Sequence, residues 1–240
     1  MSAATQGRLA VGVVGATPAG ISMAQALAGA GHLLVGITAN TPEELDRCDA
    51  MLNGVDILPL GELLTRAELV LLALPEAELV PTIGGISDEK LWKPGQLVAH
   101  TSPTHGLSIL SAAANAGVIP LAIHPAMKFT GSSLDLNRMR DSYFGVSAPK
   151  VALPIAQALV IEMGAEPVVI EDEQRGAYAE AFEVATNFSA LVVNQAIGLL
   201  EAAGIENARG IVAPSVRSAI EGALNDGHTP IDPADILRDE

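Results

Sequence analysis

The sequence predicts an α/β fold, a doubly wound parallel sheet followed by a small all-helical domain. Short apolar runs alternate with helix-like segments through the first 172 residues, a pattern typical of βαβ units. A glycine-rich turn directly follows the first apolar run, as in a Rossmann sheet. After Asp172 the alternation stops and apolar residues recur with helical spacing. We therefore expect a Rossmann-like domain over residues 1–172 and a helical substrate or dimerisation domain over residues 173–240.

The first βαβ unit is complete in the sequence. The continuous apolar run at 9–14 predicts a strand buried on both faces. A helix should span 18–30, because Pro18 fits a first helical turn and glycines stand at the exit. Residues 33–38 then form a second strand, and the threonine, proline and glutamates from Thr41 onward open another helix.

The same alternation predicts the rest of the sheet. Further strands are expected at 69–74, 96–100, 118–123, 143–147 and 167–170, with helical stretches near Leu63 and Leu79 and over 108–115 and 149–163. One long helix should cover 173–203, because the segment contains no proline, and a shorter helix should cover about 208–224.

Composition and charge exclude several classes of protein. A 49% hydrophobic and 17% charged composition supports a sizeable core. The 13 basic and 28 acidic residues give a net charge of −15, which repels phosphate backbones and anionic lipid, so we expect neither nucleic acid nor a membrane as partner. A single cysteine forms no internal disulfide or metal cluster, so we expect a cytoplasmic protein without a metal site.

The glycine-rich turn is the strongest local signal for a ligand. It reads Gly15-Ala16-Thr17-Pro18-Ala19-Gly20, where the dinucleotide-binding fingerprint belongs. The middle glycine of that fingerprint is Thr17, whose Cβ would push a pyrophosphate outward while its hydroxyl could donate to it. The alternative is that Gly15 and Gly20 only make a tight strand-to-helix turn.

The end of the second predicted strand bears on the choice of coenzyme. It reads Thr38-Ala39-Asn40-Thr41, without the acidic residue that holds the ribose diol of NAD. This absence favours NADP weakly, with NAD still possible, because no arginine is adjacent in the sequence.

Two histidines end neighbouring predicted strands. His100 and His124 each finish a strand, and in open parallel sheets ligands gather at that edge. His124 could protonate a carbonyl oxygen, and Lys128 could polarise the carbonyl or hold a carboxylate. Equally, His124 could be satisfied by backbone groups and Lys128 could be a solvated surface residue.

Several short motifs occur together in this chain. They are residues 15–20, Ala73-Leu74-Pro75, His100-Thr101-Ser102 with His105-Gly106, His124-Pro125-Ala126-Met127 with Phe129-Thr130-Gly131, and Phe144-Gly145-Val146. Together they resemble a bacterial family of Rossmann-like oxidoreductases with a helical C-terminal domain of unassigned function, related to ketopantoate reductase, pyrroline-5-carboxylate reductase and 6-phosphogluconate dehydrogenase. The resemblance implies a nicotinamide-dependent reductase, often dimeric, with ketopantoate as the concrete substrate guess.

The chain also departs from the pattern of that family. Tyr178 and Asn187 match it, whereas Ala179 replaces a histidine and Lys128 stands where relatives tend to have threonine. The tail after His228 differs as well.

We therefore expect an NADP-preferring reductase of a small keto acid or imine, and a homodimer. The expected cofactor-binding residues are Gly15, Ala16, Thr17, Pro18, Gly20, Thr38, Asn40, Leu74, Pro75 and Ser102, and the expected catalytic residues are His124, Lys128 and Asn187. The alternatives are a non-catalytic dimer that has lost cofactor binding and acts as a binding or regulatory partner, and a nucleotide binder without redox chemistry.

Overall fold

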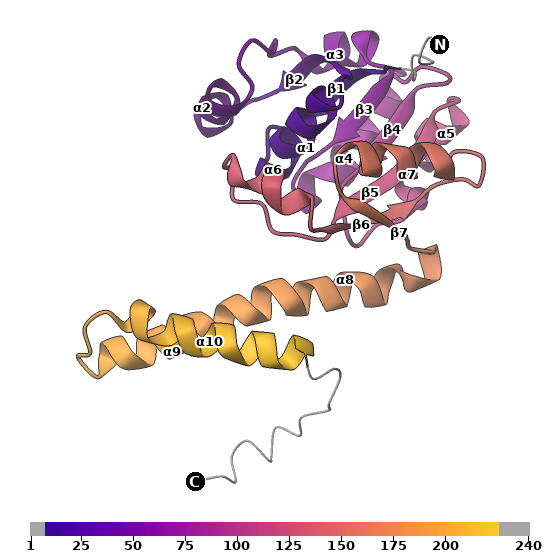
Figure 1. Ribbon diagram of the computed structural model, residues 1–240. Coiled ribbons are helices and arrows are strands. Elements are labelled where there is room, and N and C mark those ends of the chain that lie inside the picture. The colour runs from indigo at the N-terminus through magenta and orange to yellow at the C-terminus, as the bar shows by residue number, and fades with distance from the viewer. Residues whose placement is uncertain (1–7, 226–240) are drawn as a thin grey trace, which may run out of the picture. The chain divides into compact units, whose positions relative to one another are not determined.

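A computed structural model describes residues 8–225 of the chain (Figure 1). It divides into two compact units, one ending at Phe182 and the other beginning at Glu183. The strands all lie in the first unit, and the second unit is helical. The expected domain boundary after residue 172 falls where the last strand gives way to helices, and it stays a prediction.

The first unit is built on one seven-stranded sheet. Its order is β2-β1-β3-β4-β5-β6-β7, which confirms the predicted α/β fold class. The strands are β1 Ala10–Val14, β2 Leu33–Thr38, β3 Leu69–Leu72, β4 Leu97–His100, β5 Ile119–Pro125, β6 Tyr143–Ser147 and β7 Glu166–Val169. Each lies within two residues of its predicted bounds.

The direction of β6 differs from a fully parallel sheet. β1 to β5 pair in parallel, but β6 pairs antiparallel to β5, and β7 is parallel to β6. In the register of β5 and β6, His124 lies opposite Gly145 and Ala122 lies opposite Ser147. The sheet is therefore mixed, and β7 ends opposite Val146, one residue before the end of β6.

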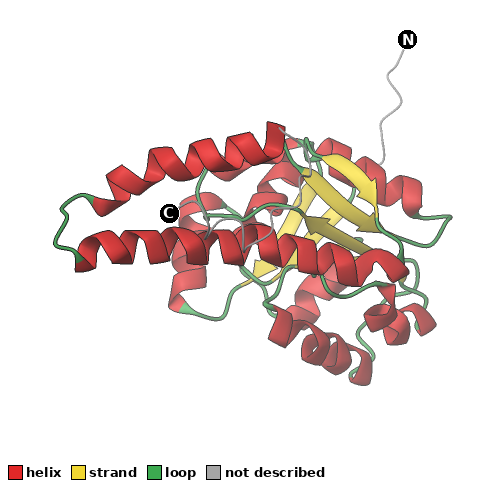
Figure 2. Ribbon diagram, turned by 90° about the horizontal axis from the view of Figure 1, so that it is seen from below, coloured by secondary structure: helices red, strands yellow, loops and turns green. Residues whose placement is uncertain are grey.

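Helices cover both faces of the sheet (Figure 2). One face buries a core against α1 Pro18–Gly29, α2 Pro42–Met51, α6 Leu134–Met139 and α7 Leu153–Glu162. The other face buries a second core against α3 Leu60–Arg66, α4 Glu76–Asp88, the 3₁₀ turn Leu107–Leu110 and α5 Ser111–Asn115. Residues of β1 to β4 feed both cores, whereas β5 and β6 contribute to the first core only.

The helix starts follow the signals in the sequence. Thr17 caps α1 through a hydrogen bond from the N–H of Gly20, and Pro18 takes the first helical turn. Thr41 and Glu44 form a reciprocal capping box at α2. These local interactions fix where each helix begins relative to the strand before it.

The predicted long helix is continuous but not uniform. A 3₁₀ turn at Asp172–Gln174 leads into α8 Arg175–Glu183, a π-helical turn spans Val184–Phe188, and α9 Ser189–Ala202 follows. The last helix is α10 Ala208–Asn225, which packs on α9 within the second unit. Across residues 8–225, none of the helices combines the length and apolar character that crossing a bilayer demands.

Candidate functional site

The glycine-rich turn between β1 and α1 has the geometry of a tight strand-to-helix connection. Gly15 has φ +97°, and a Cβ there would lie 2.5 Å from the carbonyl oxygen of Ala73. A Cβ at Gly20 would lie 2.6 Å from the carbonyl oxygen of Gly15. Both positions therefore require glycine, one for the backbone conformation and the other for close packing of helix on strand.

The Thr17 hydroxyl is used within the turn. Its Oγ1 donates to the carbonyl of Ala73 at 2.9 Å and accepts from the N–H of Gly20 at 3.1 Å. Gly15 N–H in turn donates to Thr38 Oγ1 at 2.9 Å. Because Pro18 has no N–H, the donors left for an anion at this turn are the N–H groups of Ala16, Thr17 and Ala19.

A guanidinium lies beside the same turn. Arg47, on α2, donates from Nη1 to the carbonyl oxygen of Ala16 at 2.6 Å and from Nη2 to Glu43 at 2.8 Å. No arginine is adjacent in the sequence to the end of β2, because Arg47 lies nine residues after Thr38, on α2. Arg47 follows Glu43 by four residues on the predicted helix, which is the spacing of a helical ion pair. This spacing is the signal in the sequence that points to Arg47.

A cavity of about 180 Å³ lies between the ends of β1 and β2 and helix α4. Three of the predicted cofactor residues, Thr38, Asn40 and Leu74, line it. The remaining lining residues are Val14, Leu58, Pro59, Leu60, Glu78 and Thr82. Pro75 caps α4 next to this cavity. The cavity lies at the carboxyl ends of parallel strands, where a nucleoside binds in this class of sheet.

A carboxylate also reaches the end of β2. Glu44 Oε2 accepts from the N–H groups of Asn40 and Thr41, at 2.7 and 3.1 Å. The sequence places this acid four residues beyond Asn40, so its return to the strand end depends on the capping box at α2. Its charge is balanced there by two N–H donors.

Ser102 belongs to a polar cluster at the ends of β3 and β4. Its Oγ donates to Glu76 Oε1 at 2.7 Å, and His105 Nδ1 lies 2.7 Å from the same oxygen. Thr104 also bonds to this carboxylate oxygen. Burial raises the pKa of Glu76 and these hydrogen bonds lower it, and the net shift is downward. Glu76 is therefore an ionised acceptor at the ligand edge.

His100 is a buried structural histidine. Its Nε2 lies 3.1 Å from the carbonyl of Gly106, and Nδ1 accepts from the N–H of Ser102 at 3.3 Å. Burial lowers its pKa to about 4. We infer that its neutral ring fixes the loop that follows β4.

His124 and Tyr178 form the strongest candidate for acid–base chemistry. Tyr178, on α8, places its hydroxyl 2.7 Å from His124 Nδ1 at the end of β5. The hydroxyl occupies space above Gly145, where a Cβ would lie 2.8 Å from it. Phe182 also packs against the imidazole, with the two rings edge to face and their centroids 4.7 Å apart. The pair is thus held by β5, β6 and α8 together.

Burial keeps the imidazole of His124 neutral. Desolvation, together with a smaller effect of the Arg175 charge, lowers its pKa from 6.5 to about 4. Burial also raises the pKa of Tyr178, against the opposing effect of Arg175. With Nδ1 accepting from the tyrosine hydroxyl, Nε2 carries the proton and can donate to a substrate oxygen or nitrogen.

Three side chains of α8 face the sheet at helical spacing. Arg175, Tyr178 and Phe182 stand three and four residues apart, which places them on one face of the helix. Arg175 donates from Nη2 to Ser147 Oγ, and its guanidinium carbon lies 5.9 Å from the centroid of the Tyr178 ring. The helix therefore follows β6 from Ser147 to Gly145 and delivers Tyr178 to His124.

The other two predicted catalytic residues are Lys128 and Asn187. Lys128 is exposed and makes no hydrogen bond or ion pair with another residue in the range 8–225. Asn187 is exposed in the π-helical turn and belongs to the second unit. Their catalytic roles stay predictions, and the tail from His228 lies outside the described residues.

The described part of the chain contains no cluster of three or more histidine, cysteine, aspartate or glutamate side chains placed to hold a metal ion.

The sheet order, the glycine turn and the ligand edge define a Rossmann-like protein. The chain belongs to the Rossmann-like domain family, whose model matches residues 1–125. Residues 142–231 match a second model, a domain of unknown function (DUF2520). Together they confirm the predicted organisation of a Rossmann-like sheet followed by a helical region. No curated protein matches the sequence of this chain.

Solved structures share the fold at low sequence identity. A protein from Bacteroides fragilis, described as a candidate NADP oxidoreductase, superposes with a TM-score of 0.73 at 16% identity, covering 89% of this chain and 80% of its own. An imine reductase from Streptomyces aurantiacus gives 0.66 at 21% identity, with coverage of 89% and 73%. A pyrroline-5-carboxylate reductase from Coxiella burnetii gives 0.62 at 14% identity, with coverage of 97% and 84%.

Proposed function

We propose that this protein is an NADPH-dependent reductase of a small keto acid or imine. The observation that carries the proposal is the hydrogen bond between His124 and Tyr178 at the carboxyl edge of the sheet, on the same edge as the glycine turn. The similarity to reductase structures supports the class of reaction. Ketopantoate is the first substrate to test.

The residues at the first crossover fit a dinucleotide. The free N–H groups of the turn suit a diphosphate, and the 180 Å³ cavity beside Thr38, Asn40 and Leu74 suits an adenosine ribose. Arg47 provides a cation where a 2′-phosphate would lie, and the carboxylate of Glu44 is already bound by two N–H groups. A cation at this place and an acid that is already hydrogen-bonded support a preference for NADPH over NADH.

The His124–Tyr178 pair would handle the proton of the reaction. The nicotinamide, when bound, supplies the hydride. The neutral imidazole donates from Nε2 to the substrate oxygen or nitrogen as charge develops there, and Tyr178 replenishes the proton through Nδ1. His124 is buried and Tyr178 partly buried, and this lower exposure to water strengthens the hydrogen bond between them.

Coenzyme binding and turnover test the proposal directly. NADPH and NADH are titrated by calorimetry and by thermal shift, since a ligand that binds the folded state raises its melting temperature. NADPH binding followed by NADPH-dependent loss of ketopantoate or of a cyclic imine supports the reductase. Absence of binding for both coenzymes at millimolar concentration contradicts it and favours a non-catalytic binding protein.

The second unit supports a homodimer. Among residues 183–225 only Ala208 and Val212 are buried, whereas large apolar side chains of the π-turn and α9 are exposed. These exposed residues are Val184, Phe188, Leu191, Val192 and Leu199. We propose that a second copy of the chain covers them. A monomeric mass in sedimentation at micromolar concentration would contradict this.

A further inference from the structure

The guanidinium of Arg175 is buried without a full set of partners. The residue is 3% exposed, and neither Nε nor Nη1 has a hydrogen-bond partner. Only Nη2 is bound, to Ser147 Oγ. Within residues 8–225 no carboxylate oxygen lies within 4 Å of its nitrogen atoms. A buried arginine is normally paired, so this one lacks an anion.

The two free nitrogen atoms belong to the site rather than to the core. Ser147 and Gly145 lie on the same face of β6 as His124 on β5, and Arg175 and Tyr178 lie on the face of α8 that packs there. The N–H groups of Nε and Nη1 remain as charged donors, and a charged donor binds a carboxylate oxygen more strongly than a neutral donor does. A group bound there lies beside the Tyr178 ring.

We propose that Arg175 binds the carboxylate of the substrate, so the substrates are small 2-oxo or 2-imino acids in which the acid adjoins the reducible carbon. This inference rests on the proposed reductase function and adds a substrate class to it. The guanidinium carbon lies 5.9 Å from the centroid of the Tyr178 ring, and the Tyr178 hydroxyl contacts His124, so a carboxylate held by Arg175 would lie near the carbon that this pair serves. Elsewhere the acidic surface of the chain repels anions.

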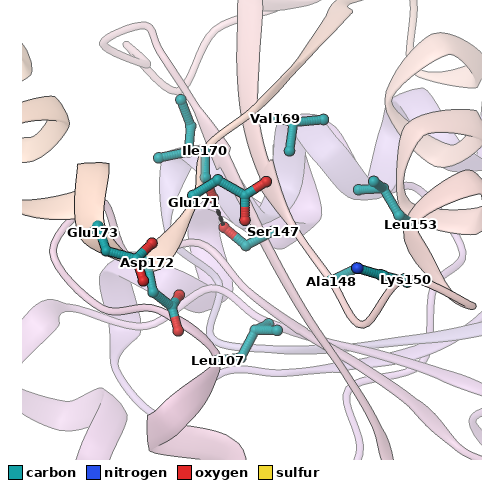
Figure 3. A pocket seen from close by; sticks show the side chains of 10 residues that line it. All are labelled: Leu107, Ser147, Ala148, Lys150, Leu153, Val169, Ile170, Glu171, Asp172 and Glu173. Atoms are coloured by element: carbon teal, nitrogen blue, oxygen red, sulfur yellow. Dashed lines mark hydrogen bonds between the residues drawn. The ribbon is translucent and has the colours of Figure 1, made fainter.

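The neighbouring cavity favours a single negative charge. Ser147, which holds Arg175, lines a cavity of about 250 Å³ together with Glu171, Asp172 and Glu173, whereas Lys150 is its one basic lining residue (Figure 3). Ser147 Oγ also donates to the carbonyl of Ile170 at 2.5 Å, which fixes the hydroxyl. Three carboxylates near the anion site disfavour a dianion such as phosphate more than a monoanionic acid.

Binding of a model acid tests the site without requiring turnover. The probe is 2-oxoisovalerate, compared with its methyl ester and with inorganic phosphate, by calorimetry on the full chain with and without NADP⁺. We expect the acid to bind in at least one condition and the ester and phosphate to bind at least tenfold more weakly. No binding of the acid in either condition, or an equal affinity for the ester or for phosphate, overturns the proposal.

Variants assign the binding to one side chain. Arg175→Gln and Arg175→Met should weaken acid binding about 30-fold or more, and Arg175→Lys should restore part of it. The control is Arg140→Gln, which removes the same charge from an exposed residue next to α6, on the opposite sheet face. Arg175→Met should melt no lower than the parent, because an uncompensated buried charge is replaced by an apolar chain. Unchanged binding or a large loss of melting temperature in Arg175→Met overturns the proposal.

Turnover separates this inference from the proposed function. If the protein reduces neutral ketones or imines with NADPH and ignores the acids, the reductase stands and the role of Arg175 fails. If acids bind through Arg175 but neither coenzyme binds, the anion site stands and the reductase fails.

Discussion

The hydroxyl of Tyr178 fills the space that Gly145 leaves open on β6. A Cβ at position 145 would lie 2.8 Å from that oxygen, too close for an unshifted side chain. Gly145 is directly opposite His124 in the sheet, so the glycine is what allows the tyrosine to reach the histidine.

Gly145→Ala should therefore separate Tyr178 from His124. We expect kcat to fall at least tenfold, because small displacements of catalytic groups are costly, with about 1–3 kcal/mol of lost stability from overpacking. Steady-state rates and urea unfolding measure the two effects. Gly84→Ala is the matched control: a Cβ there meets nothing within 4 Å on α4, so activity should be unchanged.

Tyr178→Phe removes the hydroxyl and keeps the ring. We expect kcat to fall by about 10²–10⁴-fold, the usual contribution of a positioned proton donor, while the dissociation constant of NADPH stays the same. Tyr143→Phe changes the exposed tyrosine of β6 and should leave the rate unaltered. Equal rates for Tyr178→Phe and the parent would remove the tyrosine from the mechanism.

Stability should fall as the pH is lowered from 7.5 to 5.0. His100 and His124 have folded-state pKa values of about 4 against 6.5 in an unfolded chain. The unfolded state thus binds more protons in this range, and each histidine stabilises the fold fully above pH 6.5 and progressively less toward pH 4. The loss at pH 5.0 is about 2 kcal/mol for each histidine.

Urea unfolding at the two pH values measures this loss. His124→Asn should abolish about half of the difference. A free energy of unfolding that does not change over this range would contradict the buried, neutral state of both histidines.

Thr17→Gly should have opposite effects on stability and coenzyme affinity. Loss of the cap on α1 costs only a few tenths of a kcal/mol when glycine replaces threonine, and loss of the hydrogen bond to the Ala73 carbonyl costs about 1 kcal/mol, whereas removal of the Cβ lets a diphosphate approach the turn and tightens NADPH binding. Thr17→Ser keeps the hydroxyl and should keep the stability. Calorimetry measures the affinity for NADPH, and melting temperatures measure the stability. Weaker NADPH binding by the glycine variant would show that the Thr17 hydroxyl helps to bind the coenzyme and that its Cβ does not obstruct it.

Arg47→Gln should weaken NADPH binding more than NADH binding. Loss of a charge-assisted contact to the 2′-phosphate corresponds to about 10–100-fold for NADPH, and we expect less than threefold for NADH. Arg66→Gln is the control, because Arg66 forms the same four-residue ion pair, with Glu62 on α3. Equal weakening of NADPH and NADH binding would indicate that Arg47 contacts the diphosphate, which both coenzymes share, instead of the 2′-phosphate.

Local signals in the sequence predicted much of the fold. The strand runs, the cap at Thr41 and the proline at the start of α1 depend on neighbouring residues, and the structure has them at the expected places. The reversal of β6 was missed, because apolar content does not encode the direction in which a strand pairs. The π-helical turn at Val184–Phe188 has no signal in spacing or in proline content.

The site was only partly predictable for a similar reason. Strand ends and the glycine turn identified His124 and the nucleotide cavity, since each follows a recognisable run. The contact between His124 and Tyr178 joins residues 54 positions apart, and Phe182, also on α8, packs against the same imidazole. Arg175 resembles any arginine early in a helix until its neighbours are known.

Arg175, Tyr178 and Phe182 lie on one face of α8, so an insertion or deletion before the helix would move all three side chains together. One residue gained or lost in the 3₁₀ turn before α8 would rotate the helix by about 100° and turn all three away from the sheet together. Point substitutions, in contrast, do not rotate the helix. We therefore expect this side of the site to vary by substitution and not by insertion or deletion.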